Sequence, residues 1–330
     1  MHSIVIPVFN EVAGLPALAA RLRALGHTPQ APADVVKPAG LTRVDDSPAI
    51  AFEFLLVNDG STDGSEAVLD SLAQSDPRFK ILHFSRNFGH QMAISAGLEW
   101  ATGETVTVID ADLQDPPEMI LEFIKKWHEG FEVVYGVRRA REGETVFKIF
   151  TAKIFYRLIR RLTNVSIPVD AGDFRLMDRR AVNALLAMKE RHRFVRGMVS
   201  WVGFRQTGLL YNRERRQFGE THYPFRKMLR FALDGITSFS AVPLQLATYG
   251  GLCTALIALA LGFWVLYTRL FTNQTIQGWT SLILVVLFLG GVQLLALGVL
   301  GEYLGRIYDE VKHRPLYLVS RAIGFERKSS

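Results

Sequence analysis

The sequence predicts an α/β fold with a mostly parallel sheet, followed by two membrane-spanning helices. Apolar, β-branched runs alternate with helical patterns from Met1 to Gly136, which favours parallel strands joined by right-handed crossovers. Two almost uncharged apolar runs follow at about 243–268 and 279–301, and each is long enough to cross a bilayer as a helix. We therefore expect an α/β domain over 1–224 and a membrane part with a C-terminal tail over 225–330.

Short apolar runs mark the strands of the predicted domain. They are Ser3–Phe9, Phe52–Asn58, Phe79–Phe84, Thr105–Ile109 and Val133–Gly136. Helical patterns follow the first four strands, at Leu15–Leu25, Ser65–Gln74, His90–Ala101 and Pro117–Glu129. The stretch Gly26–Ala51 carries four prolines and little periodicity, and we interpret it as a loop inserted between the first helix and the second strand.

Composition limits the partners that the chain can bind. A formal charge of +6 and a pI near 9.5 suit anionic partners such as nucleotide phosphates and lipid head groups. Nucleic acid is not expected, because the sequence holds no recognised nucleic-acid-binding module. The one cysteine, Cys253, excludes an intramolecular disulfide framework. We expect no secretory signal peptide, because the sequence starts with a strand pattern.

The stretch Thr105–Pro117, TVTVIDADLQDPP, combines a strand with an acidic turn. In an extended backbone, residues two apart point the same way. Asp110, Asp112 and Gln114 would then offer three oxygen ligands at the strand end. Mg²⁺ takes oxygen ligands and often bridges a protein carboxylate to a substrate diphosphate. A solvated acidic turn would carry the same residues, and the short motif alone does not separate the two interpretations.

Polar residues follow several of the predicted strands. Glu11, Asp59, Arg86 and Asp110 each stand just after a strand end. Ligands of open α/β sheets bind beyond the carboxyl ends of the strands, so these side chains would converge on one site. The sequence holds neither GxGxxG nor a GxxxxGK motif, which excludes the dinucleotide fingerprint and the P-loop.

Two basic segments have amphipathic helical patterns. Thr145–Leu162 places large apolar residues on one helical face and Lys153, Arg157 and Arg160 elsewhere. Such a helix either lies in the membrane interface or covers the domain core, and its pattern alone does not choose. Phe225–Ser240 is similar and leads directly into the first apolar run, which favours an interfacial position.

Five motifs together resemble a known family. IPVFNE, NDGSTDGS, SRNFG, DADLQDPPE and GDFRLM are similar to motifs of family 2 inverting glycosyltransferases of GT-A fold. The resemblance covers the whole chain. Within this family, the motifs more narrowly resemble those of polyisoprenyl-phosphate glycosyltransferases, namely dolichol-phosphate mannose synthases and bactoprenol-phosphate glucosyltransferases. Two features depart from the family pattern. The Gly26–Ala51 insert is longer than expected, and the frequent RxxGxSKY motif reads RQFGETHY at Arg216–Tyr223.

The resemblance implies a role for each group of site residues. Asp59 would recognise the nucleoside base of a nucleotide-sugar donor. The other donor-binding residues would be Pro7, Phe9, Asn10, Glu11, Arg86, Asp110 and Ala111. Asp110, Asp112 and Gln114 would hold Mg²⁺ or Mn²⁺. The catalytic candidates are Asp112, Asp170 and Asp173, of which the last two would act either as a base or in orienting the acceptor. The residues that would bind acceptor or donor phosphates are Arg213, Arg216 and Lys227.

The implied activity is inverting transfer of a sugar from a nucleotide sugar to a polyprenyl (undecaprenyl or bactoprenyl) phosphate at the cytoplasmic membrane face. UDP-glucose is the expected donor, and GDP-mannose, UDP-GlcNAc and UDP-aminoarabinose stay open. A lipid phosphate is mostly ionised at neutral pH, so it needs less help from a general base than a sugar hydroxyl does. Membrane lipids are further expected partners, and a homo-oligomer is compatible with the sequence.

Three other functions fit parts of the sequence. A nucleotidyltransferase would also use two aspartates and a metal ion, but it would release pyrophosphate and would not explain the apolar runs. A non-catalytic membrane scaffold that binds nucleotide sugars would not need an intact acidic metal motif. A processive polysaccharide synthase would carry a QxxRW-type motif, which the sequence lacks.

Basic residues flank the two apolar runs on their outer sides. They are Arg226, Lys227 and Arg230 before the first run, and Arg306, Lys312 and Arg314 after the second. The connector between the runs holds only Arg269. Cytoplasmic loops carry an excess of Lys and Arg, so we expect the domain and the C-terminal tail on the cytoplasmic side.

Overall fold

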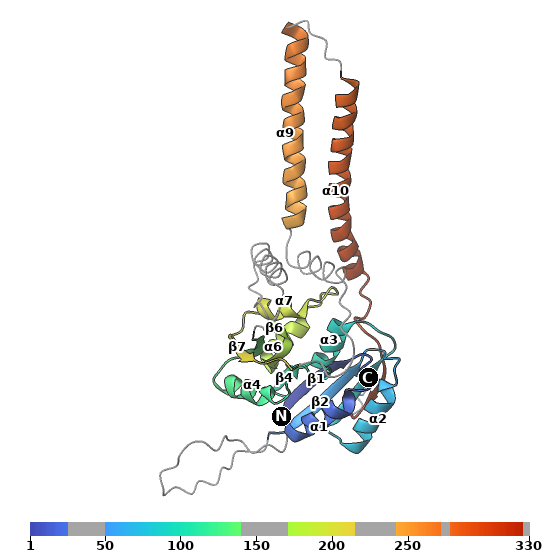
Figure 1. The fold of residues 1–330 in the computed structure, drawn as a ribbon, viewed down its shortest axis with the longest axis vertical. Coiled ribbons are helices and arrows are strands. Elements are labelled where there is room, and N and C mark those ends of the chain that lie inside the picture. The colour runs from blue at the N-terminus through green and yellow to red at the C-terminus, as the bar shows by residue number, and fades with distance from the viewer. Residues whose placement is uncertain (26–49, 140–170, 215–241, 272–277, 326–330) are drawn as a thin grey trace. The chain divides into compact units, whose positions relative to one another are not determined.

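The computed structural model describes residues 1–25, 50–139, 171–214, 242–271 and 278–325. They fall into two units (Figure 1). The sheet unit holds the described residues up to Glu214 together with Pro315 to Phe325, and the helical hairpin holds the two long apolar helices. The inserted loop, apart from its last two residues, and both amphipathic basic segments lie outside the described residues.

A mixed sheet with mostly parallel strands forms the centre of the sheet unit. The strands are β1 (His2–Val8), β2 (Phe52–Asn58), β3 (Phe79–Phe84), β4 (Thr105–Val108), β5 (Val133–Arg138), β6 (Ala171–Asp178), β7 (Gln206–Tyr211) and β8 (Val319–Ile323). In the described residues their order is β7-β5-β6-β4-β1-β2-β3-β8. β1 pairs in parallel with β2 and β4, whereas β6 and β8 run antiparallel to their neighbours. The predicted α/β fold is confirmed.

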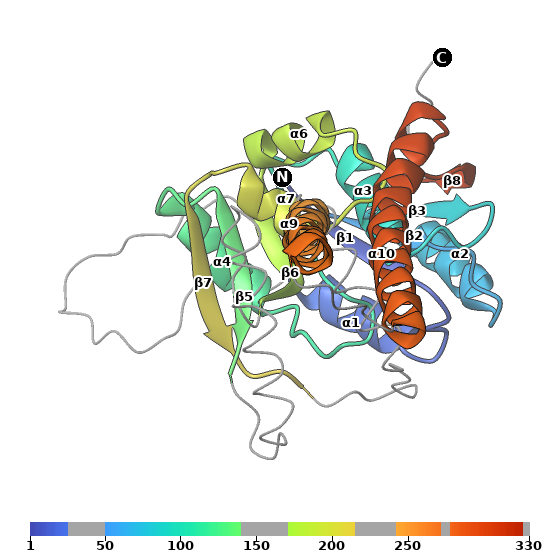
Figure 2. The ribbon, with the colours of Figure 1, turned by 90° about the horizontal axis from the view of Figure 1, so that it is seen from above.

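Helices cover both faces of this sheet (Figure 2). On one face, α1 (Leu15–Leu25), α2 (Ser65–Ser75) and α4 (Met119–His128) bury their apolar residues in the larger core cluster. On the other face, α3 (His90–Trp100) packs in a second cluster, and α6 (Arg179–Ala187) and α7 (Val195–Trp201) follow in the chain. Because both faces are covered, β1 and β2 are buried at every position, which explains their mostly apolar sequences.

Three strands were not predicted from the sequence. β6 holds Asp173 and Arg175 inside the sheet, and these charges interrupt the apolar pattern that predicts a buried strand. β7 is only partly buried. β8 is a short strand at the sheet edge and contains Arg321. Each therefore lacks the apolar run by which the other strands were found.

The C-terminal segment differs from the expected tail of the membrane part. After the second apolar helix the chain returns to the sheet, where β8 pairs antiparallel with β3, with Ile323 opposite Ile81 and Val319 opposite Phe84. An uncovered β3 would present a row of unpaired backbone groups. β8 supplies hydrogen-bond partners for the backbone groups of β3, so this segment belongs to the sheet unit.

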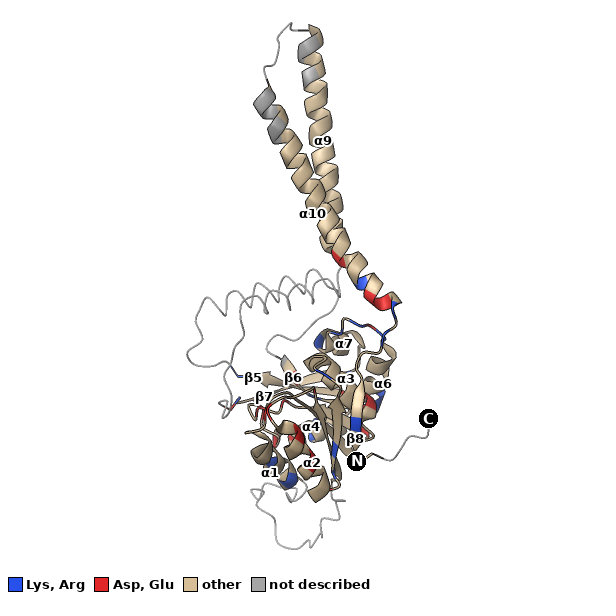
Figure 3. Ribbon diagram, turned by 90° about the vertical axis from the view of Figure 1, so that its right-hand side faces the viewer, with Lys and Arg blue, Asp and Glu red and all other residues tan. Residues whose placement is uncertain are grey.

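The helical hairpin consists of α9 (Val242–Phe271) and α10 (Trp279–Val311). Both are long and apolar enough to cross a membrane, over Val242–Trp264 and Val285–Val311. Large apolar side chains along them are exposed, such as Leu246 and Leu295. Among the residues of the hairpin that Figure 3 colours by charge, the charged ones lie towards the end of α10. Exposed apolar surface of this extent suits lipid better than water.

Candidate active site

The loops that follow β1 and β2 are joined by hydrogen bonds. The Asn10 side chain accepts one from the Thr62 amide at 2.8 Å, and Ser61 Oγ accepts one from the Asn10 amide at 3.0 Å. The Asp63 carboxylate accepts another from the Val12 amide at 2.9 Å. Asn10 has a φ of 55°, a left-handed conformation that asparagine tolerates better than most residues. The two loops are thus fixed to each other at the carboxyl edge of the sheet.

Asp59, directly after β2, holds the loop Ser85–Gly89 that follows β3. Its two carboxylate oxygens accept hydrogen bonds from the amides of Phe88 at 2.6 Å and Gly89 at 2.9 Å. Burial raises the pKa of Asp59, and the two amide donors partly oppose that shift. The Arg86 guanidinium lies over the Phe88 ring, 4.1 Å from its centroid. Asp59 therefore anchors the loop that carries Arg86.

Gly60 allows these two loops to touch. Its φ is 67°, and a Cβ atom there would lie 2.5 Å from the carbonyl carbon of Arg86 and 2.6 Å from the amide nitrogen of Asn87. A side chain would meet both backbone strain and a clash with backbone atoms that cannot easily move. The turn after β2 requires glycine at this position.

The acidic motif lies on a turn. β4 ends at Val108, Leu113 has a φ of 58°, and the Asp112 carboxylate accepts a hydrogen bond from the Gln114 amide at 3.1 Å. The premise that Asp110, Asp112 and Gln114 alternate along an extended strand is therefore wrong, because the aspartate side chain bends the backbone into a turn. Their assignment as metal ligands stays a prediction.

Asp110 has a carboxylate oxygen without a hydrogen bond. Its Oδ1 atom is buried and has no hydrogen-bond partner in the part of the chain that the structure describes, and His90 Nε2 lies 3.6 Å away. Burial raises the pKa of Asp110 to about 6. The charge of His90 opposes this shift, whereas Asp173, Asp115 and Asp112 add to it. A bound divalent cation would relieve both the missing bond and the crowding of negative charge.

Asp173, in β6, is held by two basic groups. Arg196 of α7 donates hydrogen bonds to both of its oxygens, at 2.8 and 2.9 Å, and His90 Nε2 lies 3.3 Å from Oδ2. Burial favours the neutral acid, but Arg196 and His90 together hold the pKa of Asp173 well below its usual range. Burial also lowers the pKa of His90, but Asp173 and Asp110 raise it to a net value above normal.

A second charged cluster joins the acidic turn to the ends of β5 and β7. The Tyr211 hydroxyl donates a hydrogen bond to Asp115 Oδ1, and Arg138 Nε donates one to the Tyr211 oxygen at 3.4 Å. Arg213 Nε lies 3.6 Å from the same Asp115 oxygen. Asp115 Oδ2 is buried and has no hydrogen-bond partner among the described residues. Two guanidinium groups therefore lie beside the acidic turn.

Comparison with known proteins decides the family. The model described as Glycosyl transferase family 2 matches residues 3–186. The chain belongs to glycosyl transferase family 2. The match confirms the resemblance of the motifs and the GT-A-like fold that it implies.

Relatives of this glycosyltransferase match it over nearly its whole length. The glycosyltransferase YkcC of Bacillus subtilis (strain 168) is 50% identical over 99% of this chain and 95% of its own. The prophage bactoprenol glucosyl transferase homolog of Escherichia coli (strain K12) is 39% identical over 97% of this chain and 98% of its own. Among solved structures, mannosyl-3-phosphoglycerate synthase from Rubrobacter xylanophilus is 18% identical with a TM-score of 0.46, over 76% of this chain and 75% of that chain.

Most of the residues predicted to bind the donor lie around the joined loops of the glycosyltransferase. Asn10, Asp59 and Arg86 belong to the contacts described above, and Phe9 is 47% exposed beside Asn10. Pro7 is buried within β1, Glu11 begins the turn before α1, and Ala111 is buried in the acidic turn. Their contact with a donor stays a prediction. Asp170, Arg216 and Lys227 lie outside the described residues.

Four residues at this edge were missed in the sequence. His90 follows β3 and its loop, and Arg138 ends β5. The strand-end argument that found Arg86 would have found both residues as well. Tyr211 ends β7, which was not predicted. Arg196 lies in a short helix, far from Asp173 in the sequence. No helical or strand periodicity relates the two positions, so only the folded structure shows that they pair.

One further acidic group stands away from the acidic turn. Glu66, Asp70 and His83 have ligand atoms within 4.8 Å of one another, and they are the one such group of three found in the described residues. Arg321 of β8 already pairs with Glu66 and Asp70, at 2.7 Å each. This arginine already supplies one positive charge to the two carboxylates.

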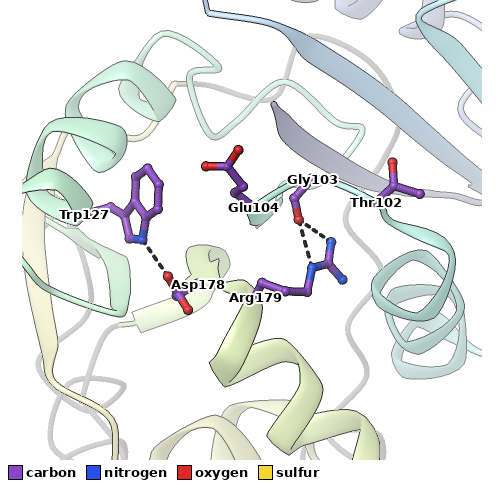
Figure 4. Close-up of a pocket in the computed structure, with 6 residues that line it drawn as sticks. All are labelled: Thr102, Gly103, Glu104, Trp127, Asp178 and Arg179. Atoms are coloured by element: carbon purple, nitrogen blue, oxygen red, sulfur yellow. Dashed lines mark hydrogen bonds between the residues drawn. The ribbon is translucent and has the colours of Figure 1, made fainter.

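A surface hollow lies at the opposite edge of the sheet (Figure 4). It is lined by Thr102, Gly103, Glu104, Trp127, Asp178 and Arg179. Arg179 donates to the Gly103 carbonyl at 2.8 Å, and Trp127 Nε1 donates to Asp178 at 2.9 Å. The hollow precedes β4, at the amino ends of the parallel strands, whereas ligands of such sheets bind beyond the carboxyl ends. Its contacts link the end of β6 to the loop before β4.

Proposed function

We propose that this glycosyltransferase moves a glucosyl residue from UDP-glucose to a polyprenyl phosphate such as undecaprenyl phosphate. An oxygen of the lipid phosphate attacks the anomeric carbon, the bond from that carbon to the diphosphate breaks, and UDP leaves with the electron pair. This single displacement inverts the anomeric configuration. Bactoprenol glucosyl transferases of Shigella phages SfII and SfV, 39% and 40% identical over 97% and 96% of this chain, support the lipid acceptor and the glucosyl donor.

The observation that carries this proposal is the meeting of opposite charges at one edge of the sheet. Asp110 has a buried oxygen without a hydrogen bond. Asp115 of the same turn pairs with Arg213, and it contacts Arg138 by way of the Tyr211 hydroxyl. A displacement between two phosphate-bearing substrates needs a cation at the leaving diphosphate and fixed positive charge at the attacking phosphate. The edge supplies candidates for both.

Asp110 and Asp112 would hold the Mg²⁺ or Mn²⁺ ion, with Gln114 as a further oxygen ligand. The unbonded oxygen and the raised pKa of Asp110 fit this role, because a cation would complete the coordination of a carboxylate that is costly to leave ionised. When bound, the ion would neutralise the charge that develops on the leaving diphosphate.

Asp173 would act by positioning. A carboxylate whose pKa lies well below its usual range is a weak base, and both of its oxygens already accept hydrogen bonds from Arg196. An ionised lipid phosphate needs little activation. Asp173 would therefore hold His90 and Arg196 in place around the acceptor, which leaves Asp170 as the remaining candidate for a base.

Arg138 and Arg213 would bind the acceptor phosphate, since guanidinium groups suit phosphate oxygens in number and geometry. The Tyr211 hydroxyl and Asp115 would orient these two arginines. Arg216 and Lys227 keep their proposed role as further phosphate contacts.

The sheet restricts the membrane topology. Strands β1 to β7 precede α9, β8 follows α10, and all of them belong to one sheet. If both apolar helices cross the membrane, the chain before and after them must therefore lie on the same side. Arg306 near the end of α10, with Lys312 and Arg314 after it, outnumbers Arg269 near the end of α9, and this excess favours the cytoplasmic side for the sheet unit.

The test is to incubate the purified full chain with polyprenyl phosphate and labelled UDP-glucose, GDP-mannose, UDP-GlcNAc or UDP-aminoarabinose. We expect release of UDP and a labelled lipid with UDP-glucose, and only when a divalent ion and the lipid are both present. Transfer from another donor alone would replace the proposed sugar. Release of pyrophosphate would indicate a nucleotidyltransferase, and donor binding without turnover would indicate a binding scaffold.

A further inference from the structure

The segment that returns from the membrane helices lies against the donor side of the site. We name Pro315–Phe325 the C-terminal strap. It contains β8 and is separated from the end of α10 only by residues 312–314. β8 pairs with β3, and β3 runs directly into the loop Ser85–Gly89 that Asp59 holds. The chain thus connects a membrane helix to the edge of the candidate donor site.

Before β8 begins, the strap makes contacts that go beyond strand pairing. The Tyr317 ring stacks on Phe84, with centroids 5.0 Å apart and planes 16° apart. The Leu318 carbonyl accepts a hydrogen bond from the Ser85 amide at 3.0 Å, and the Tyr317 hydroxyl donates one to Glu99 near the end of α3 at 2.5 Å. The edge of β3 would be covered by the β8 backbone without any of the Tyr317 contacts.

These contacts continue to the loop that Asp59 holds. Phe84 meets Phe88 edge-to-face, with centroids 5.6 Å apart and planes 89° apart. Phe88 in turn donates its amide to Asp59 and lies under the Arg86 guanidinium. Tyr317, Phe84 and Phe88 therefore form a continuous aromatic row. The two ends of the row are the strap and the residues predicted to contact the nucleotide.

We infer that Tyr317 is a positioning residue for the nucleotide: through Phe84 and Phe88 it holds the loop Ser85–Gly89, so that Asp59 and Arg86 face the donor. The inference rests on the proposed function for the identity of the ligand as a nucleotide. Without the ring of Tyr317, Phe84 and Phe88 gain space to move, and the two amides that bind Asp59 lose their fixed direction. Donor affinity should then fall, while the acceptor side should keep its geometry.

Arg321 offers a matched control on the same strap. Its guanidinium pairs with Glu66 and Asp70 of α2, and in the described part of the chain it makes no hydrogen bond or ion pair with the loop Ser85–Gly89. Arg321→Ala weakens the attachment of the strap, whereas Tyr317→Ala breaks the aromatic row. Tyr317→Phe keeps the ring and removes the hydroxyl, with its hydrogen bonds to Glu99 and Trp100.

The experiment uses the full chain in detergent and compares the wild type with Tyr317→Ala, Tyr317→Phe and Arg321→Ala. UDP affinity is measured by calorimetry, KM for donor and acceptor by turnover, and hydrogen exchange at residues 85–89 by mass spectrometry. We expect Tyr317→Ala to weaken UDP binding about five- to tenfold, in line with the loss of an aromatic pair, with faster exchange at 85–89 and an unchanged acceptor KM. Tyr317→Phe should stay within about twofold of the wild type.

Arg321→Ala should lower the melting temperature without changing UDP affinity. Wild-type UDP affinity in Tyr317→Ala, or equal weakening in Tyr317→Ala and Arg321→Ala, would overturn the inference. If the wild type binds no nucleotide, the proposed function fails, and exchange at 85–89 still decides the positioning role: it must be faster in Tyr317→Ala than in Arg321→Ala. If Tyr317→Ala does not fold, Tyr317→Leu gives the same comparison with a bulkier side chain.

Discussion

Two halves of the carboxyl edge of the sheet differ in how their polar groups are satisfied. In the half that follows β1, β2 and β3, Asn10 and Asp59 accept hydrogen bonds from backbone amides. In the half formed by β4, β6 and β7, buried atoms of Asp110, Asp115 and Arg213 have no hydrogen-bond partner among the described residues. Buried polar atoms are usually bonded. The first half is thus completed by the protein alone, and the second would be completed by a metal ion and phosphates.

The largest expected effect is at Asp110. The difference between the two halves predicts that removing its charge lowers activity but does not lower stability. Asp110→Asn removes a carboxylate that would hold the metal ion, so turnover should fall at least about 100-fold. The melting temperature in EDTA should stay the same or rise, because the variant no longer buries a poorly bonded charge. Asp112→Asn should lose turnover in the same way.

Turnover with saturating Mn²⁺ and thermal unfolding in EDTA check this expectation. Near-wild-type activity of Asp110→Asn and Asp112→Asn would remove the acidic turn from the proposed metal site. A large drop in melting temperature for Asp110→Asn would show instead that the carboxylate supports the fold.

The next effect separates acceptor from donor binding. Arg138→Gln should raise KM for polyprenyl phosphate about tenfold or more, because it removes a charged hydrogen-bond donor to phosphate. UDP affinity should not change. Arg205→Gln is the matched control, since Arg205 lies over Phe131 near the start of β7, away from the acidic turn. Weaker UDP binding by Arg138→Gln would place this arginine on the donor instead.

A smaller effect tests the half of the edge that follows β1, β2 and β3. Gly60→Ala should lower the free energy of unfolding by about 1–3 kcal/mol and weaken UDP binding, because its Cβ would push the Arg86 loop away. Gly64→Ala is the control: Gly64 also has a positive φ, 91°, but a Cβ there meets nothing within 4 Å. Denaturant unfolding and calorimetry with UDP measure both. Equal UDP affinity in the two variants would mean that the contact with the loop does not shape the donor site.

The smallest effect is expected at the acidic group beside β8. Glu66→Gln should leave turnover and its metal dependence within about twofold of the wild type, because an exposed ion pair contributes little. Its melting temperature should fall only slightly. A change in the Mn²⁺ concentration needed for half-maximal activity would move the proposed metal site from the acidic turn to Glu66, Asp70 and His83.

The sequence predicted site residues in both halves, but in the second half it missed the strands β6 and β7 and the partners of the buried charges. β1, β2 and β3 are mostly apolar, and Asp59 and Arg86 stand just after β2 and β3, so period and position were enough to place them. β6 could not be found in this way, because Asp173 and Arg175 break its pattern. Asp173 is paired with Arg196, far away in the sequence, and Arg175 donates a hydrogen bond to the nearby Gly172 carbonyl. The ion pair of Asp173 with Arg196 depends on a register that no local signal specifies.

The acidic turn shows a different limit. The residue types predicted the chemistry, but the assumed extended backbone was wrong, because the left-handed Leu113 and the bond from Gln114 to Asp112 form a turn. The Asp170, Arg216 and Lys227 predictions stay predictions. The strap was missed for a further reason: five residues, VSRAI, carry too little pattern to predict a strand that pairs with a partner made much earlier.

The pairing of β8 with β3 also sets the order in which the chain is completed during synthesis. β3 is synthesised early. The edge of β3 that pairs with β8 has no partner until both apolar helices and β8 have been synthesised. At about 5–20 residues per second, residues 85–318 take roughly 10–50 s to make. During that time β3 is an unpaired edge, a known site of aggregation. A fragment that ends before α9 would keep this edge open permanently, so the sheet unit can close its own fold only after the two apolar helices have been made.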